Sequence, residues 1–486
     1  MVIVFVLVGV VALAVLGALH WYAWRRLVRD TTSGPGVARR VGAAVFVAGP
    51  LLMFGAVASE RAGAPFWLQR VLAWPGFLWM ALVIYLVLAL VVGEFVRPLV
   101  RRVVERRAVV SSARTDSSAR TDSSERASSS EHADSSVPAV ASDRAPAPSG
   151  SAVSSDSAVS SASGDASTAA VSSAPAVSSA PAIEGESGPR RSVASLSVGS
   201  TGAGRPPLSV DAPSRRLFVS RVVGGAAAAA AVGTVGYGTY GVLRGPRVKR
   251  VTVPLAKLPR SAHGFRIAVV SDIHLGPVLG RGFAQTVVDT INATQPDLIA
   301  VVGDLVDGSV KDLGPAAAPL ARLRARHGSF FVTGNHEYFS GAGQWVREVR
   351  ELGIHPLENA RTELAGFDLA GVNDVQGESE GQGPDFGKAL GDRDTSRACV
   401  LLAHQPVQIH EAVRHGVDLQ LSGHTHGGQL WPGNFIADAA NPTLAGLERY
   451  GDTQLYVSRG AGAWGPPTRV GAPSDITVVE LASREA

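Results

Sequence analysis

In the second half of this 486-residue chain, five short apolar runs each end in residues that can bind a metal ion. Runs of this length predict buried β-strands. Because ligands bind beyond the carboxyl ends of strands in open α/β sheets, we expect the side chains after these runs to converge on one rim. The runs are 266–270 before Asp272 and His274, 298–302 before Asp304, 330–332 before Asn335 and His336, 399–402 before His404, and 417–421 before His424 and His426.

The segments between these runs show helical periodicity. Their apolar residues recur every three or four positions, which places them on one face of a helix. One face holds Phe283, Val287, Val288 and Ile291, and another holds Trp345, Val346, Val349 and Leu352. Strands that alternate with helices predict an α/β domain, and residues 245–486 are numerous enough to bury a sizeable core.

The side chains at the run ends suit a pair of divalent first-row metal ions. Residues two apart in an extended segment leave on the same side, so Asp272 and His274 can reach one rim together. Mixed imidazole and carboxylate ligands favour Mn, Fe or Zn over Ca. Two dications, two aspartates and a bridging hydroxide sum to about +1, which would attract an anionic phosphoryl group. We expect Gly303, Gly334 and Gly423 to let the backbone turn sharply at the strand ends.

The only cysteine, Cys399, rules out an intrachain disulfide framework and a cysteine-cluster metal site. It lies within an apolar run, so we expect a small buried hydrophobic residue. Charge adds a second exclusion. The chain carries 45 Lys and Arg against 41 Asp and Glu, a net charge of +4, so no nucleic-acid partner is expected.

Three apolar segments in residues 1–107 predict a membrane domain with three transmembrane helices, at 1–24, 41–59 and 74–96. Buried helices of a soluble core are the alternative. Basic clusters follow the first and third segments, so the positive-inside rule places both clusters in the cytoplasm and the N-terminus outside. The sequence therefore predicts a multi-pass protein of the cell membrane.

Residues 108–213 are rich in Ser, Ala and Pro and contain few residues that could be buried, which predicts a disordered cytoplasmic linker. Residues 214–244 begin with Ser214, Arg215 and Arg216 and continue as a Gly- and Ala-rich apolar stretch. This pattern fits either a twin-arginine export signal or a fourth transmembrane helix. Both alternatives place residues 245–486 on the extracytoplasmic side.

The motifs of residues 272–426 also carry a family resemblance. Asp-x-His, Gly-Asp, Gly-Asn-His-Glu, His and Gly-His-x-His appear in the order that is typical of the calcineurin-like metallophosphoesterases. The resemblance covers roughly residues 248–481 and implies a layered α/β sandwich of mixed β-sheets flanked by helices. The sequences of residues 334–338, 403–406 and 423–429 resemble those of the bacterial membrane-associated branch of this family. Members of that branch are similar to phosphodiesterases and pyrophosphatases that act on envelope precursors such as UDP-diacylglucosamine.

The resemblance further implies roles for single residues. The metal ligands form two sets that share Asp304 as a bridge: Asp272, His274 and His426 for one ion, and Asn335, His404 and His424 for the other. His336 would not bind metal but would protonate the leaving oxygen or stabilise the transition state, and a metal-bridging hydroxide would attack phosphorus. Glu337, where many relatives carry Asp, would orient His336.

For several other residues near these motifs we expect mainly structural roles. We expect Asp307 to cap a turn rather than to bind metal. Arg459 and Arg469 could clamp a substrate phosphate or form structural salt bridges. Asn373 and Asp374 also follow a short apolar run, but they could equally form a turn. Five further histidines in residues 245–486 match no motif and are expected in loops or in contact with solvent: His263, His327, His355, His410 and His415.

Two classes of function are consistent with these patterns. The first is a membrane-tethered, binuclear metal-dependent phosphoesterase that hydrolyses a phosphodiester or pyrophosphate bond of a cell-envelope substrate, either a phosphorylated small molecule or a lipid-linked compound. The second is a catalytically silent scaffold or receptor with the same fold. Loss of a ligand would favour the scaffold, and since all seven ligand positions and His336 are occupied, the sequence favours the enzyme.

Overall fold

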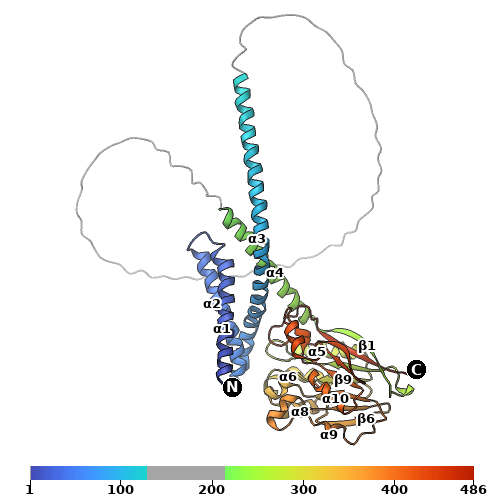
Figure 1. Ribbon diagram of the computed structural model, residues 1–486. Coiled ribbons are helices and arrows are strands. Elements are labelled where there is room, and N and C mark those ends of the chain that lie inside the picture. The colour runs from blue at the N-terminus through green and yellow to red at the C-terminus, as the bar shows by residue number, and fades with distance from the viewer. Residues whose placement is uncertain (1, 129–213, 486) are drawn as a thin grey trace, which may run out of the picture. The chain divides into compact units, whose positions relative to one another are not determined.

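The computed structural model describes residues 2–128 and 214–485 (Figure 1). The described parts up to Val110 and from Ser214 onward form one compact unit. Within it, residues from Arg247 onward build two six-stranded mixed sheets. In spatial order the first sheet contains β1 (Arg247–Leu255), β12 (Asp475–Ser483), β2 (Phe265–Val270), β3 (Leu298–Val302), β4 (Ser329–Val332) and β5 (His355–Pro356). The second contains β10 (Gly446–Tyr450), β11 (Thr453–Val457), β9 (Leu419–Ser422), β8 (Cys399–Leu402), β7 (Asp368–Gly371) and β6 (Ala360–Glu363).

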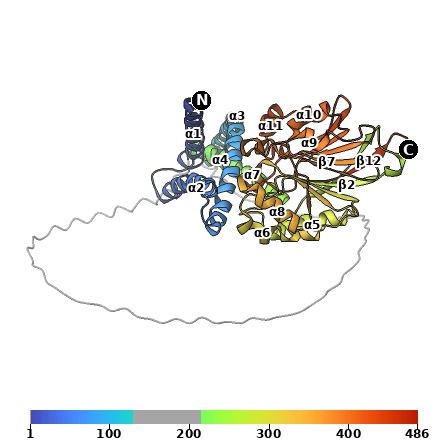
Figure 2. The same ribbon diagram turned by 90° about the horizontal axis from the view of Figure 1, so that it is seen from below.

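The helices cover the outer faces of the two sheets. Figure 2 shows α5, α6 and α8 on one side of the strands and α9 and α10 on the other. The bounds are α5 (Arg281–Ala293), α6 (Val310–Ala317), α7 (Asn335–Ser340), α8 (Ala342–Glu351), α9 (Phe386–Leu390), α10 (Ile409–Arg414) and α11 (Asn434–Ala440). Both predicted helices are confirmed, since their apolar faces lie in α5 and in α8 with the residue that follows it.

Successive side chains along each strand point to opposite faces of the sheet, which explains how the apolar residues fill separate core layers. In β2, Ile267 and Val269 pack between the two sheets, whereas Ala268 and Val270 pack toward the α5 and α8 layer. The outer face of the second sheet forms a third cluster with α9 and α10. Side chains that alternate between two buried faces give continuous apolar strands, which is the pattern that the sequence contains. The predicted fold class, a metallophosphoesterase-type layered sandwich, is confirmed.

The five predicted strands are β2, β3, β4, β8 and β9, and they are divided between the sheets. The strands β2, β3 and β4 pair in parallel in the first sheet, and β8 pairs in parallel with β9 in the second. The rim that receives their carboxyl ends is therefore made by two sheets packed face to face. This arrangement lets one sheet present ligands toward those of the other.

Four helices in the described residues are long and apolar enough to cross a membrane. They are α1 (Val2–Trp24), α2 (Val37–Arg61), α3 (Phe66–Ser128) and α4 (Arg215–Leu243). The most hydrophobic stretch lies in α3, within the Phe66–Arg107 part that could span. Small residues let α4 approach its neighbours, because Ala231 is buried in a cluster with Ala81 and Tyr85 of α3.

The structure differs from the sequence prediction at the start of the linker. The predicted linker begins at residue 108, whereas α3 continues to Ser128. Residues 108–128 contain neither Gly nor Pro, so nothing in the sequence terminates the helix there. The rest of the predicted linker, 129–213, lies outside the described residues. The segment 215–243 is a continuous helix, which fits both a fourth span and an export signal, so that choice and the domain boundaries stay predictions.

Candidate metal centre

The loops after β2, β3 and β9 hold the candidate ligands in an uncommon backbone conformation. Five of them have a positive φ between 49° and 73°: Asp272, His274, Asp304, His424 and His426. A non-glycine residue in this region costs on the order of 1–3 kcal/mol and persists only where the surroundings enforce it. Local strain concentrated at these residues is typical of a functional site.

Two glycines allow close approach at the same place, for different reasons. Gly303 has φ of 74°, so it turns the chain as predicted, and a Cβ there would lie 2.6 Å from His404 Nδ1. Gly334 has an ordinary φ of −102°. Glycine is needed at position 334 because a Cβ there would overlap the Asp304 carboxylate. The expectation of a sharp turn at Gly334 is therefore wrong, and the residue is needed for packing.

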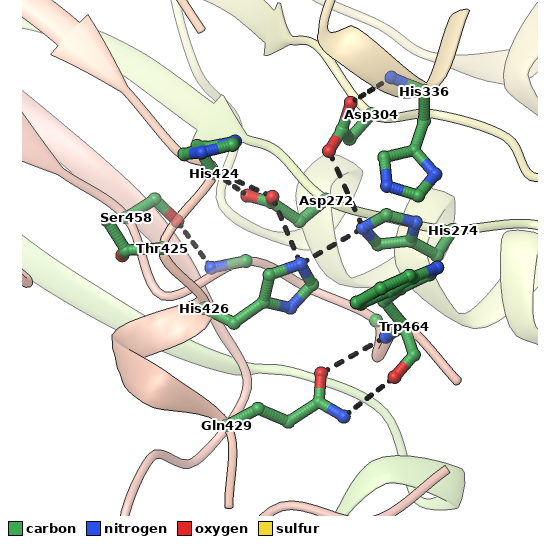
Figure 3. Close-up of polar contacts among 12 residues, drawn as sticks. Asp272, His274, Asp304, His336, His424, Thr425, His426, Gln429, Ser458 and Trp464 are labelled. Atoms are coloured by element: carbon green, nitrogen blue, oxygen red, sulfur yellow. Dashed lines mark hydrogen bonds and ion pairs between the residues drawn. The ribbon is translucent and has the colours of Figure 1, made fainter. Parts of the chain in front are cut away.

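One group of candidate ligands comes from the loops after β2 and β9. Asp272, His274 and His426 offer ligand atoms that all lie within 4.8 Å of one another. The Nε2 atoms of His274 and His426 face each other at 3.0 Å, and His426 Nε2 lies 3.4 Å from Asp272 Oδ1 (Figure 3). Two imidazole nitrogens and a carboxylate oxygen thus point at one small volume. These are the three residues predicted to hold the first ion.

A second group lies beside the first. Asp304, His404 and His424 also have ligand atoms within 4.8 Å of one another. Asp304 Oδ2 is 3.1 Å from His404 Nε2 and 3.8 Å from His274 Nε2, so this carboxylate faces both groups. His424 Nδ1 is 3.0 Å from Asn335 Oδ1. All seven predicted ligands are brought together, although their roles as ligands stay predictions.

The geometry around His404 tests whether these residues suit a metal ion. Its Nδ1 donates a hydrogen bond to the Val302 carbonyl at 2.8 Å, which directs Nε2 into the site. That Nε2 is buried and makes no well-aligned hydrogen bond, and the Asp304 carboxylate lies 3.1 Å from it. A histidine whose ring is oriented by a hydrogen bond from one nitrogen to a backbone carbonyl, with the other nitrogen directed into the site, is typical of metal ligation. The nitrogen and oxygen donor set therefore fits first-row divalent ions.

The pKa values of the candidate ligands are shifted because their ionisable groups are buried close together. Burial would raise the pKa of Asp304, but His404, His274 and His336 hold it well below its ordinary value. The pKa of Asp272 is raised, chiefly by burial. Burial lowers the pKa of His424 to about 4, so this imidazole is neutral at pH 7. A neutral imidazole is the form that binds metal.

The carboxylate of Asp307 corrects one expectation. It does not act as a simple turn cap, because its Oδ1 lies 2.6 Å from His336 Nδ1 and 3.0 Å from His274 Nδ1. Burial would lower the pKa of His336, but the hydrogen bond and charge of Asp307 raise it to about 9. Asp307 therefore holds both imidazoles, and with them it forms a third cluster of potential ligands. The only sequence indication of this role was that Asp307 lies three residues after Asp304.

The predicted role of Glu337 is also wrong. Its buried carboxylate does not contact the His336 ring but accepts backbone N–H bonds from Asp304 at 3.0 Å, Leu305 at 2.7 Å and Gly334 at 2.6 Å. Glu337 thus ties the loop after β3 to the start of α7. Orientation of His336 comes from Asp307, which is closer in space although it is farther in sequence.

Sequence reasoning missed an aromatic wall beside His336. The rings of Trp464 and Phe339 each lie with centroids 5.5 Å from the His336 ring. Gln429 holds Trp464 in place: its Nε2 donates to the Trp464 carbonyl at 2.9 Å and its Oε1 accepts from the Trp464 N–H at 3.1 Å (Figure 3). No motif indicated a role for Trp464, because it is distant from His336 in sequence, whereas Phe339 lies three residues after His336 in α7.

Of the two arginines near the C-terminus, Arg459 and Arg469, the structure gives Arg469 a clear structural role. Arg469 is buried and donates to the carbonyls of Gly462, His426 and Ala472, with Nη2 3.0 Å from His426 Nδ1. It supports the His426 loop, so its guanidinium is engaged with the protein itself. Burial lowers the pKa of Arg469 to about 10, and the side chain remains charged at pH 7.

The plainer expectations are mostly met. Cys399 is fully buried, as predicted. Asp374 caps the short 3₁₀ helix Val375–Glu380 by accepting from the Gln376 N–H, in keeping with a turn. The five histidines of residues 245–486 that lie outside the motifs are exposed or partly exposed: His263, His327, His355, His410 and His415.

Comparison with known proteins agrees with this geometry. The family described as calcineurin-like phosphoesterase matches residues 265–428. A Danio rerio protein named transmembrane protein with metallophosphoesterase domain is 38% identical over 259 residues, covering 50% of this chain and 59% of that protein. A metallophosphoesterase of Helicobacter pylori (strain J99) is 38% identical over 247 residues, covering 50% of this chain and 66% of that protein. One from Aquifex aeolicus is 36% identical over 240 residues, covering 48% of this chain and 91% of that protein.

The sandwich fold and the clustered His, Asp and Asn side chains at its rim define the class of metal-dependent phosphoesterases. Within that class, the chain belongs to the calcineurin-like metallophosphoesterase family. The chain spans 59% and 66% of the lengths of the first two relatives. Its membrane helices accompany a domain whose relatives include proteins named as transmembrane.

Proposed function

We propose that this protein is a membrane-anchored phosphoesterase that uses two divalent ions to hydrolyse a phosphodiester or pyrophosphate bond of an envelope substrate. The observation that carries the proposal is the pair of ligand groups that share the carboxylate of Asp304, with His336 beside them. Asn335 Oδ1 lies 3.0 Å from His424 Nδ1, which supports Asn335 as a ligand in the second group. When bound, the ions would supply Lewis-acid activation of water and of the phosphoryl group.

The chain's own residues would position the proton donor. His336 lies outside the two ligand groups that share Asp304, and Asp307 holds its Nδ1, which leaves Nε2 free to face a leaving oxygen. The raised pKa of His336, about 9, keeps the ring protonated at pH 7. A protonated imidazole at this place is suited to donate a proton to the departing alkoxide or phosphate. Trp464 and Phe339 flank the ring and would restrict water around it.

A catalytically silent scaffold is the alternative function. The strained conformations of five candidate ligands and the convergence of their side chains favour a metal-binding site, and a hydrolysis screen separates catalysis from a silent scaffold.

The decisive experiment is a hydrolysis screen with the purified full-length protein in detergent. Mn²⁺, Fe²⁺ and Zn²⁺ are supplied separately, and the substrates are a nitrophenyl monoester, a bis-nitrophenyl diester and a nucleoside diphosphate sugar. The proposal expects metal-dependent cleavage of the diester or the pyrophosphate. Metal-loaded, folded protein that cleaves none of them would support the scaffold.

The proposed location is a multi-pass membrane protein with the catalytic domain on the extracytoplasmic side. Arg97, Arg101 and Arg102 at the end of the third predicted span, and Arg215 with Arg216 before α4, favour cytoplasmic placement of both segments. Reporter fusions at Ser149 and after Ala486 test this orientation. A reporter that works only in the cytoplasm should be active at Ser149 and silent at the C-terminus, and the reverse pattern would contradict the proposal.

A further inference from the structure

Large apolar side chains are exposed on the catalytic domain near the candidate metal centre. In α11 no residue is buried, and Phe435 and Ile436 are 64% and 77% exposed. Trp431 precedes this helix and is also exposed, and Trp464 beside His336 is 53% exposed. Exposed apolar side chains that lie near a functional site mark a binding surface or a membrane contact.

The end of α4 marks the level of the membrane surface. Tyr237 and Tyr240 are exposed there, and the Arg244 guanidinium lies over the Tyr240 ring at 6.0 Å. Aromatic rings followed by a basic residue are typical of the boundary between lipid and water. In the same turn, the hydroxyls of Thr239 and Thr468 are 2.7 Å apart. Thr468 of the catalytic domain therefore lies at this boundary.

Two further contacts lead from this boundary to the segment 431–440. The Trp431 N–H donates to the Val470 carbonyl at 2.9 Å, and the Tyr85 hydroxyl of α3 donates to the Trp431 carbonyl at 2.9 Å. Tyr85 belongs to the apolar stretch 74–96 of α3, so the segment 431–440 begins in direct contact with a helix that is predicted to span the membrane. Leu430 and Val470 also pack against the apolar cluster that α3 and α4 share.

The same segment is joined to the catalytic imidazole. Gln429, two residues before Trp431, holds Trp464 through two hydrogen bonds, and Trp464 packs edge-on against His336 (Figure 3). Phe339, also exposed, contacts the same imidazole. An exposed aromatic wall does little for a small polar substrate. It suits a substrate that carries an apolar chain next to its phosphate.

From these contacts we infer that the segment 431–440 inserts into the surface of the bilayer and that the substrate is a membrane-embedded amphiphile whose phosphate group reaches the metal centre along the Trp464 and Phe339 wall. Trp431, Phe435 and Ile436 are the inserted side chains. The choice of substrate rests on the proposed function, whereas insertion of the segment does not. The bilayer is the occupant of this surface because the segment is continuous, through Tyr85 and Val470, with the membrane helices.

Insertion is tested without any activity measurement. Because Cys399 is fully buried, a cysteine placed on the surface can be labelled selectively with a polarity-sensitive dye. Full-length Phe435→Cys is labelled and reconstituted into phosphatidylethanolamine and phosphatidylglycerol vesicles that contain a nitroxide lipid. The matched control is Val413→Cys in α10, an exposed apolar position outside the segment.

The dye at position 435 should be quenched at least about twofold more strongly than the dye at position 413, as expected for a side chain buried in the headgroup and acyl boundary. It should also be shielded from iodide in the water. Equal lipid quenching at the two positions would overturn insertion, because the inference requires the segment to differ from an ordinary exposed helix.

The substrate class is tested with a ratio of rates. The double variant Phe435→Ser/Ile436→Ser is compared with the unchanged protein on a dialkylglycerol nitrophenyl phosphodiester in vesicles and on its short-chain, water-soluble analogue. The rate on the vesicle substrate relative to the soluble one should fall about tenfold. An unchanged ratio would overturn the assignment of an amphiphile. If metal-loaded protein cleaves neither diester, the proposed function and the substrate assignment fail together, and the dye experiment still decides insertion.

Discussion

The rim of the two sheets and the first membrane helix place opposite demands on their residues. At the rim, Asp304 lies within 4 Å of two histidines, and Gly334 is needed because a Cβ there would overlap the Asp304 carboxylate. In α1, apolar side chains such as Val10 are exposed to the surroundings and contact few defined partners. Positions at the rim are specified atom by atom, whereas the exposed apolar positions of α1 are specified by hydropathy.

The largest effect that would sharpen this contrast is expected at Asp304. Asp304→Asn should lose activity by several orders of magnitude, because a neutral amide facing both ligand groups binds two cations poorly. Metal content measured by mass spectrometry should fall with activity. A variant that retains two ions and normal turnover would show that Asp304 does not join the two groups.

A smaller effect with a different signature is expected at His336. His336→Ala should reduce turnover about 10²–10⁴-fold, which is the usual contribution of a general acid. Metal content should remain that of the unchanged protein, because this imidazole lies outside the two ligand groups that share Asp304. If the variant purifies without metal, His336 is a ligand and the third cluster with His274 and Asp307 is a true metal site.

Asp307 should have an intermediate role. Asp307→Asn should reduce turnover about 10–100-fold, since loss of a partner that orients a functional histidine typically costs this much. The pH optimum should shift downward, because Asp307 raises the pKa of His336 to about 9 and the variant loses that stabilisation of the protonated ring. Asp452→Asn, in the exposed turn between β10 and β11, is the matched control and should be silent. An unshifted pH profile would contradict the positioning role.

The smallest effect is expected in α1. Val10→Leu should change neither activity nor thermal stability beyond about 0.5 kcal/mol, because an exposed apolar residue is replaced by one of similar hydropathy. Activity in micelles and a melting curve suffice to check this. A large loss would mean that α1 has a specific partner, and the contrast between the two regions would break.

The contrast between the rim and α1 also explains which features of the site could be predicted from the sequence. The ligands Asp272, His404 and His424 follow apolar runs directly, so their position at strand ends follows from local order along the chain. Parallel pairing then brings those ends together. The roles of Asp307 and Glu337 were mistaken, because each depends on which groups the neighbouring loops after β2, β3 and β4 bring opposite it.

By itself the sequence determined the α/β class, the five strands, the set of candidate ligands and the apolar membrane segments, since each follows from hydropathy and from residues adjacent in the chain. Only the tertiary structure decided that two sheets share the rim, that Asp307 holds His336, and that Gln429 fixes Trp464 beside it. The physical reason is distance along the chain: these partners are joined by packing between elements, and hydropathy patterns contain no information about which polar atoms will face each other once the layers close.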